Sequence, residues 1–174
     1  MTLKLREIER NDIKEINKWR RDPELIALLG STYRYINEEV DLNWFDTYMK
    51  SRNNCVRCAI VEEGDEGAIL GCVYLLNIDR TNSCADFSIM IGDTLNRGKG
   101  LGSFATKEML RHAFYDLNLH RVQLQVLTLN DRAINMYLKC GFVEEGIRRK
   151  AIFKNGRYID IMMMSVLKED YVCE

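Results

Sequence analysis

The stretch Arg97-Gly98-Lys99-Gly100-Leu101-Gly102 is the most informative part of this chain, because its three glycines stand between a strand-like run and an amphipathic helix. The first backbone amides of a helix have no acceptor within the helix and lie at the positive end of its dipole. Glycine lets a ligand approach such amides closely, and Arg97 and Lys99 add positive charge. The stretch is therefore typical of a loop that binds phosphate.

Spacing separates the known kinds of phosphate loop. A nucleotide-hydrolysing P-loop needs a glycine, four residues and then Gly-Lys-Ser/Thr. Here Gly98-Lys99 is followed by another glycine, and the nearest upstream glycine is one residue too distant. A dinucleotide fingerprint could run through Gly100, Gly102 and Ala105, but it needs an acidic residue roughly 20 positions later at a strand end. The next strand-like run, 121–127, is followed by threonine, so this interpretation is weak.

A second motif favours a third interpretation. The glycine stretch has the form Gln/Arg-x-x-Gly-x-Gly/Ala, and the chain later reads Asn130-Asp131-Arg132-Ala133-Ile134-Asn135-Met136-Tyr137 and then Gly141-Phe142. Together the two motifs resemble the GNAT superfamily of acetyl-CoA-dependent N-acyltransferases, and the resemblance covers nearly the whole chain. The pattern is most similar to the branch of ribosomal-protein N-terminal, spermidine and aminosugar acetyltransferases.

The resemblance implies a co-substrate and its contacts. Acetyl-CoA is expected to place its pyrophosphate on the glycine loop and its pantetheine arm and thioester beside the 130–137 helix. The reaction's oxyanion is expected at a backbone amide of the strand 88–91, where a bulge releases the amide from sheet pairing. The implied cofactor-binding residues are Ile89, Met90, Ile91, Arg97, Gly98, Lys99, Gly100, Leu101, Gly102, Ser103, Asn130, Ala133, Asn135 and Tyr137.

Periodicity along the chain predicts a single α/β domain over residues 1–174 with the order βααβββαβαββ. The implied GNAT arrangement is a twisted seven-stranded mixed sheet with helices on both faces, in which two central parallel strands splay apart. Asn155-Gly156 predicts the turn of a final hairpin. The expected strands are 3–8, 56–62, 69–77, 84–91 and 121–127 with two more within 142–166, and the expected helices begin near 12, 37, 101 and 130.

Composition limits the partners and the compartment. The 174 residues are 47% hydrophobic and carry a formal net charge of −1, with both signs interspersed. Such a chain lacks the positive field that nucleic-acid binders use, so we expect no nucleic-acid partner. No apolar run reaches the length that spans a membrane and no signal peptide is evident, so we expect a cytoplasmic protein without a membrane partner.

The cysteines are expected to be reduced packing residues rather than disulfides. Three of the six lie in strand-like runs and Cys140 lies at a helix end. Cys55-x-x-Cys58 has the spacing of half a zinc site, but there is no second such pair and only two histidines to complete it. We therefore expect no metal.

Tyr137 is the candidate general acid for the departing thiolate. A phenol with an ordinary pKa of about 10 stays protonated at neutral pH, whereas the thiol that it would protonate has a pKa near 8.5. Asn130 and Tyr137 are two helical turns apart, so both can face the cofactor, with Ala133 leaving room between them. Tyr137 could instead be only a core aromatic, and Asn130 only a helix cap.

The general base has two candidates, Asp86 and Glu38. An amine with a pKa of about 10.4 is neutral in only about 1 molecule in 2,500 at pH 7, so an alkyl amine needs a base far more than a peptide N-terminus does. Asp86 lies on the strand leading to the thioester and would act through water. Glu38 lies at the start of the acceptor-side helix. Either carboxylate could equally be only a solvated or salt-bridged side chain.

The acceptor is expected to be a primary amine, either a protein N-terminal amine of the ribosomal type or a nucleotide-linked aminosugar, with spermidine as the alternative. Residues 33–39, followed by Trp44-Phe45, resemble the acceptor entrance of ribosomal-protein N-terminal acetyltransferases and of acetyltransferases that act on nucleotide-linked aminosugars. Spermidine would need carboxylates, which Glu38, Glu39 and Asp41 could supply. A non-catalytic coenzyme A sensor is a further alternative. A homodimer or higher homo-oligomer could form through the final hairpin and the apolar run 159–164, although burial inside the monomer also explains that run.

Overall fold

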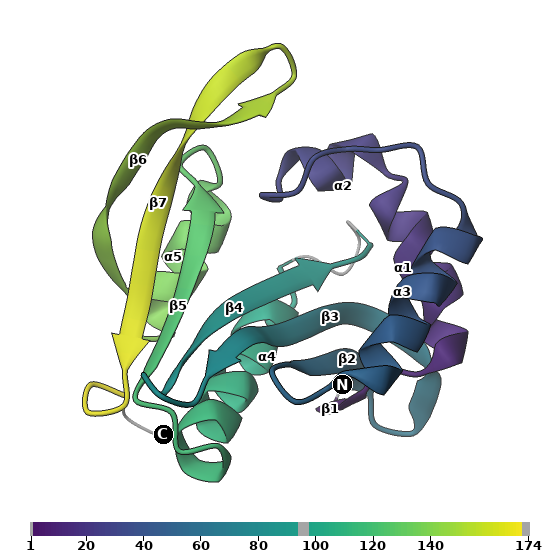
Figure 1. Cartoon of the computed structure of the whole chain (residues 1–174), viewed down its shortest axis with the longest axis horizontal. Coiled ribbons are helices and arrows are strands. Elements are labelled where there is room, and N and C mark those ends of the chain that lie inside the picture. The colour runs from purple at the N-terminus through teal and green to yellow at the C-terminus, as the bar shows by residue number, and fades with distance from the viewer. Residues whose placement is uncertain (1, 94–97, 172–174) are drawn as a thin grey trace.

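The computed structural model describes residues 2–93 and 98–171 and has the predicted mixed α/β architecture (Figure 1). One seven-stranded sheet has the strand order β1-β2-β3-β4-β5-β7-β6. A 3-10 turn (Arg10–Asp12) precedes α1, and a π-helical turn (His112–Asp116) extends α4. The strands and helices are β1 (Leu3–Glu7), α1 (Ile13–Arg20), α2 (Pro23–Ala27), α3 (Glu38–Lys50), β2 (Val56–Glu62), β3 (Asp65–Asp79), β4 (Cys84–Ile91), α4 (Leu101–Arg111), β5 (Arg121–Leu127), α5 (Asp131–Lys139), β6 (Val143–Lys154) and β7 (Arg157–Leu167).

The predicted order of elements is confirmed, with one addition. The short helix α2 was not expected from the sequence. Its cause is local, because the Asp22 carboxylate accepts from the amides of Glu24 (2.9 Å) and Leu25 (3.2 Å), and Pro23 supplies the fixed φ of a first helical position.

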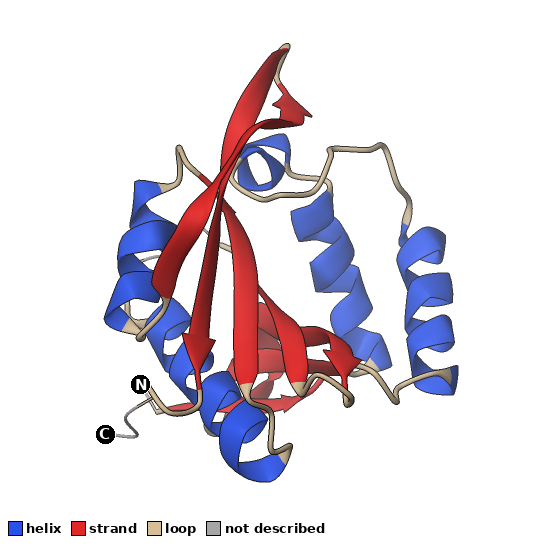
Figure 2. Cartoon of the chain, turned by 60° about the vertical axis from the view of Figure 1, so that its left-hand side comes forward, coloured by secondary structure: helices blue, strands red, loops and turns tan. Residues whose placement is uncertain are grey.

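Helices cover both faces of the sheet (Figure 2). Apolar side chains of α4 and α5 pack with one face in a core that includes Leu101, Met109, Phe114, Phe142 and Met164. A second core joins α1 and α3 to the other face of β2 and β3 and includes Ile13, Trp19, Phe45, Ala59 and Cys72. The sheet is therefore buried on both faces, and this packing holds its strands in place.

The two parallel strands at the centre of the sheet separate. β4 pairs with β5 only from Cys84 opposite Arg121 to Asp86 opposite Gln123, and every other neighbouring pair of strands in the sheet is antiparallel. Beyond Asp86, β4 stays paired with β3 up to Ile91, while β5 stays paired with β7. Figure 1 shows the ends of β4 and β5 pointing apart. The predicted splay is therefore present, and it opens a cleft in the middle of the sheet.

The elements that border the cleft end where the sequence predicts. The Asn130 carboxamide caps α5 by accepting from the Ala133 amide at 3.2 Å, and Gly141 follows the helix with φ +94°. Asn155 and Gly156 both have positive φ, as a two-residue hairpin turn requires. At the end of β4, a Cβ added to Gly92 would lie 2.0 Å from the Trp19 ring, so only glycine allows α1 to pack there.

Candidate active site

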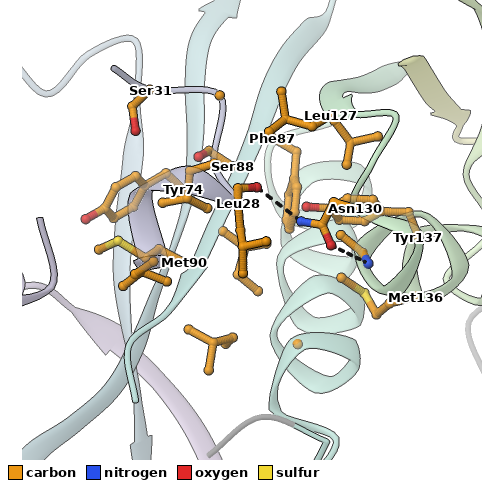
Figure 3. Close-up of a pocket in the computed structure, with 18 of the residues that line it drawn as sticks. Leu28, Ser31, Tyr74, Phe87, Ser88, Met90, Leu127, Asn130, Met136 and Tyr137 are labelled. Carbon is orange, nitrogen blue, oxygen red and sulfur yellow. Dashed lines mark hydrogen bonds between the residues drawn. The ribbon is translucent and has the colours of Figure 1, made fainter. Parts of the chain in front are cut away.

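A cavity of about 790 Å³ occupies the cleft between the separated strands. Residues of β4, β5, α4 and α5 form one side, and residues of α1, α2, the loop after α2, α3, β2 and β3 form the other (Figure 3). Eleven residues implied by the GNAT resemblance line it together: Ile89, Met90, Ile91, Gly98, Gly100, Leu101, Gly102, Ser103, Asn130, Ala133 and Tyr137.

The glycine loop forms one end of this cavity. Gly98 (φ +85°) and Gly100 (φ +84°) have left-handed backbones, and Gly100 is the N-cap of α4, so the amides at the helix start are available to an anion. Lys99 is exposed and is absent from the lining. Arg97, which the sequence suggests as a pyrophosphate contact, lies outside the described residues.

Arg132 is a cationic residue of this end that sequence reasoning missed. It lies in the first turn of α5 and lines the cavity, and its guanidinium lies 3.3 Å from the position that a Cβ on Gly98 would take. The Asn130-to-Tyr137 motif contains Arg132, so the signal was present. The role of Arg132 depends on how close α5 lies to the glycine loop, and this distance cannot be predicted from the sequence.

The strand β4 presents free backbone groups to the cleft. Gly92 donates its amide to Leu70 of β3 at 3.1 Å, and amides alternate between the two sides of a strand. Ile89 and Ile91 therefore point their amides and carbonyls toward the gap left by β5. The expected bulge in 88–91 is wrong, because the β3–β4 register is regular from Leu76–Asp86 to Gly71–Ile91. The splay of β5 frees the amides instead.

Tyr137 lies at the centre of the cavity wall. Its side chain is 7% exposed and packs edge-on against Phe87, with ring centroids 6.1 Å apart, and against Phe142 at 5.6 Å. Burial raises the pKa of the Tyr137 phenol well above its ordinary value, so the hydroxyl keeps its proton at neutral pH. In Figure 3 the hydroxyl end of Tyr137 points into the cavity beside Asn130.

Asn130 has two structural contacts in addition to its place in the lining. Its Oδ1 accepts from the Ala133 amide, and its Nδ2 donates to the Leu28 carbonyl at 3.1 Å. The second bond joins α5 to the loop after α2 across the cavity (Figure 3). Asn135, the other asparagine of the motif, is exposed and does not line the cavity. Met136, which the sequence did not indicate, lines it and packs close to Gly102.

The two candidate bases occupy different places. Asp86 lies at the last β4–β5 pair, where its carboxylate accepts from Gln123 Nε2 (2.9 Å) and Asn77 Nδ2 (2.8 Å). It is two positions before Ser88, so both side chains share a sheet face, but Asp86 is absent from the cavity lining. Glu38 is the exposed first residue of α3 and is also absent from the lining.

The acceptor half of the cavity is built by residues from α1, α2, α3, β2 and β3, with Ser88 of β4. Arg20, Trp44, Arg57, Tyr74 and Ser88 bring polar or aromatic groups to it. The predicted entrance residues Tyr33, Arg34 and Tyr35 are not part of the lining. Sequence reasoning missed Arg57 and Tyr74, because their approach to Ser88 depends on the register of three strands.

A lysine from the final hairpin holds the loop that closes this half. Lys154 is 7% exposed, and its Nζ donates to the Ile26 carbonyl at 2.6 Å and to the Ser31 carbonyl at 2.8 Å. Burial lowers the pKa of Lys154. The hairpin thereby fixes both ends of the segment that runs from α2 to Ser31.

Fold and site together define an acetyl-CoA-dependent N-acetyltransferase. The chain belongs to the GNAT family, since the profile of the acetyltransferase (GNAT) domain matches residues 2–143. In the described part of the chain, no three His, Cys, Asp or Glu side chains are grouped as metal ligands. No helix within the described residues is long and apolar enough to cross a membrane.

Particular relatives share almost the whole chain. The spermidine N(1)-acetyltransferase of Vibrio cholerae serotype O1 is 31% identical over 98% of this chain and 95% of its own length. The enzyme of the same name from Escherichia coli K12 is 32% identical over 99% and 90%. The crystal structure of the Vibrio cholerae spermidine N-acetyltransferase with CoA and spermine superimposes with a TM-score of 0.90 at 28% identity, covering 98% of both chains.

Proposed function

We propose that this chain transfers the acetyl group of acetyl-CoA to a primary amine by direct attack within a ternary complex. The observation that carries the proposal is that the glycine loop, the free amides of β4 and the Tyr137 hydroxyl meet in one cavity. The loop with Arg132 would hold the pyrophosphate of the co-substrate, and the acceptor would enter from the side of α1 to α3.

The chemistry follows from the groups at the centre. The amine nitrogen attacks the thioester carbonyl, and the oxyanion that develops is stabilised by an amide of Ile89 or Ile91 on the open side of β4. The C–S bond then breaks, and the Tyr137 phenol donates its proton to the leaving thiolate. Asp86, acting through water, is the proposed base that removes the amine proton, and Glu38 is the second candidate.

Two acceptor classes have a specific observation in their favour. Spermidine is supported by the relatives that carry its name and match almost the full chain. An amine on an anionic molecule, such as a nucleotide-linked aminosugar, is supported by Arg20 and Arg57 in the acceptor half of the cavity. A protein N-terminal amine of the ribosomal type is the remaining class that the sequence suggests.

An acceptor screen tests the function. The purified chain is incubated with acetyl-CoA and, separately, with spermidine, nucleotide-linked aminosugars and N-terminal peptides, and products are detected by mass. An acetyl group gained on one class supports the proposal and identifies the acceptor. Tight acetyl-CoA binding in calorimetry without acetylation of any amine would contradict it and favour a coenzyme A sensor.

We also propose a cytoplasmic location and a homo-oligomer. Within the run 159–164, Ile159, Ile161 and Met164 are buried in the monomer, so this run is not an oligomer surface by itself. The same hairpin exposes Ile147 (50%), Phe153 (57%) and Tyr158 (65%), which supports contact with a second copy there. Light scattering of the wild-type chain and of an Ile147→Asp variant measures the oligomeric state.

A further inference from the structure

The acceptor half of the cavity has an uneven charge. Three charged side chains line the cavity in the described residues, and all of them, Arg20, Arg57 and Arg132, are positive. Arg132 lies at the glycine loop, which leaves two guanidinium groups in the acceptor half. A cleft that binds a polyamine needs carboxylates, because each amine of the ligand other than the reacting one stays charged at neutral pH.

The charge of Arg20 already has a counter-charge. Its guanidinium forms an ion pair with Asp41, whose side chain is fully buried. Asp41 is held in turn by Asn17, whose Nδ2 donates to Asp41 Oδ2 at 2.7 Å. Asp41, which the sequence suggested for binding spermidine, is therefore already paired with Arg20 and Asn17 and does not line the cavity.

The charge of Arg57 has no such counter-charge among the described residues. Its guanidinium lies 4.8 Å from the ring centroid of Trp44 and 4.9 Å from that of Tyr74, so aromatic faces hold it in place. Its Nε is buried and has no hydrogen-bond partner. A guanidinium presents a planar fork of donors that fits two oxygens of a phosphate or carboxylate.

Arg57 is also aligned with the reaction centre. In the strand register, Arg57 of β2 is opposite Tyr74 of β3, and Tyr74 is opposite Ser88 of β4. Residues opposite one another share a sheet face, and neighbouring strands are about 4.8 Å apart, so Arg57 starts about 10 Å from Ser88 on the same wall. Figure 3 places Tyr74, Ser88 and Met90 together, facing Tyr137 across the cavity.

We propose that Arg57 binds an oxyanion of the acceptor, so that the natural substrate is a primary amine on a molecule that also carries a phosphate or carboxylate group. This inference rests on the proposed acetyl transfer and narrows its acceptor. A polyamine would bring two or more positive charges next to an unbalanced guanidinium, whereas a phosphorylated amino sugar would balance it within the span between Ser88 and Arg57.

Matched acceptor pairs test the assignment. Initial rates are measured for glucosamine 1-phosphate against glucosamine, for 5-aminopentanoate against pentylamine, and for spermidine. We expect kcat/KM to be at least 10-fold higher for the anionic member of one pair, and the better pair tells phosphate from carboxylate. Equal rates within both pairs, or spermidine as the best acceptor, would overturn the inference.

Variants of Arg57 connect that preference to the residue. Arg57→Met is expected to remove the preference through a higher acceptor KM, with the KM of acetyl-CoA unchanged, and Arg57→Lys is expected to keep part of it. The matched control is Arg52→Met, because the guanidinium groups of Arg52 and Arg57 both lie over the Tyr48 ring, 5.9 and 5.5 Å from its centroid, but Arg52 does not line the cavity. A preference that survives in Arg57→Met would contradict the proposal.

Two further measurements keep the test decisive. If Arg57→Met does not fold, rising salt must still lower kcat/KM for the anionic acceptor and leave the neutral one unchanged in the wild-type chain. If no amine is acetylated, the proposed function fails, and the subsite is then tested alone by titrating uridine monophosphate into the chain saturated with coenzyme A. Heat of binding that Arg57→Lys weakens supports the subsite, and no heat overturns it.

Discussion

At the scale of single residues, Tyr137 carries the proposed catalytic chemistry. Its phenol is buried, it keeps its proton at neutral pH, and it has no hydrogen-bond partner among the described side chains that Tyr137→Phe would orphan. We therefore expect Tyr137→Phe to fold normally and to bind acetyl-CoA as the wild type does, but to lose about 10²- to 10⁴-fold in kcat, the usual contribution of a general acid.

Calorimetry with coenzyme A and steady-state rates on the identified acceptor check this expectation. Tyr115→Phe is a suitable control, because Tyr115 is an exposed tyrosine outside the cavity lining. An unchanged kcat in Tyr137→Phe would mean that water or another group protonates the thiolate.

Gly92 is a second residue with a specific role, and this role is in packing rather than in catalysis. A Cβ at this position would lie 2.0 Å from the ring of buried Trp19, which has no room to move away. We expect Gly92→Ala to destabilise the fold by about 1–3 kcal/mol, as overpacking of a core usually does. Urea denaturation measures the loss, and Gly67→Ala, where nothing lies within 4 Å, should change stability by less than about 0.5 kcal/mol.

At the scale of elements, the β6–β7 hairpin supports the acceptor loop through one side chain. Lys154 Nζ donates to the carbonyls of Ile26 and Ser31, which lie on either side of the cavity-lining segment 28–31. Lys154→Met keeps the apolar stem but leaves the Ser31 carbonyl without its donor and the Ile26 carbonyl with only backbone donors such as the Leu29 amide at 3.1 Å, so we expect a loss of about 1–3 kcal/mol in stability.

The same variant should raise the acceptor KM more than the KM of acetyl-CoA, because the loop lies at the acceptor end of the cavity. Arg149→Met, an exposed change on the same hairpin, is the matched control. If Lys154→Met lowers stability but leaves the acceptor KM unchanged, the lysine supports the fold and has no part in positioning the loop.

Elements whose structure is encoded by a few adjacent residues were predictable from the sequence. Contacts between distant elements were not. The glycine loop, the Asn130 cap and the Asn155-Gly156 turn each carry their structure in a few adjacent residues. The helix α2 had an equally local signal in Asp22-Pro23 that sequence reasoning overlooked.

The missing bulge and the Arg57 subsite belong to a different class of feature. The β4 amides are free because β4 splays away from β5, and no bulge is needed. The Arg57 subsite results from a register that aligns three strands. Both depend on pairings between distant parts of the chain, for which a single sequence contains no local pattern. The GNAT resemblance predicted the splay of the two parallel strands, but it did not predict the positive charge in the acceptor half of the cavity.

At the scale of the whole molecule, buried thiols link stability to alkaline pH. Burial raises the pKa of Cys58 to about 11 and that of Cys72 to about 12, above the value of about 9 that both have when unfolded. Below pH 9 these thiols are protonated in both states and their contribution to stability is complete. Between about pH 9 and 12 the unfolded chain binds fewer protons than the native one, so stability falls as pH rises.

Other groups add to this fall or oppose it. The phenols of Tyr74 and Tyr137 also have pKa values raised by burial, so they add to the loss above about pH 10. Lys154 opposes it, because a lowered lysine pKa makes the native state release a proton first and stability then rises with pH. Six acids with a raised pKa, these four together with Tyr48 and Cys140, against one lysine predict a net decrease.

We therefore expect the urea midpoint to be constant from pH 7.5 to 8.5 and to decrease steadily at pH 9.5 and 10.5, with reductant present throughout. Cys72→Ala removes one of the titrating groups, so its midpoint should be lower at pH 7.5 but should decrease less steeply. A wild-type midpoint that stays constant up to pH 10.5, or parallel slopes for the two chains, would mean that water reaches these thiols in the native state and that the sheet between the two cores opens far more readily than its burial implies.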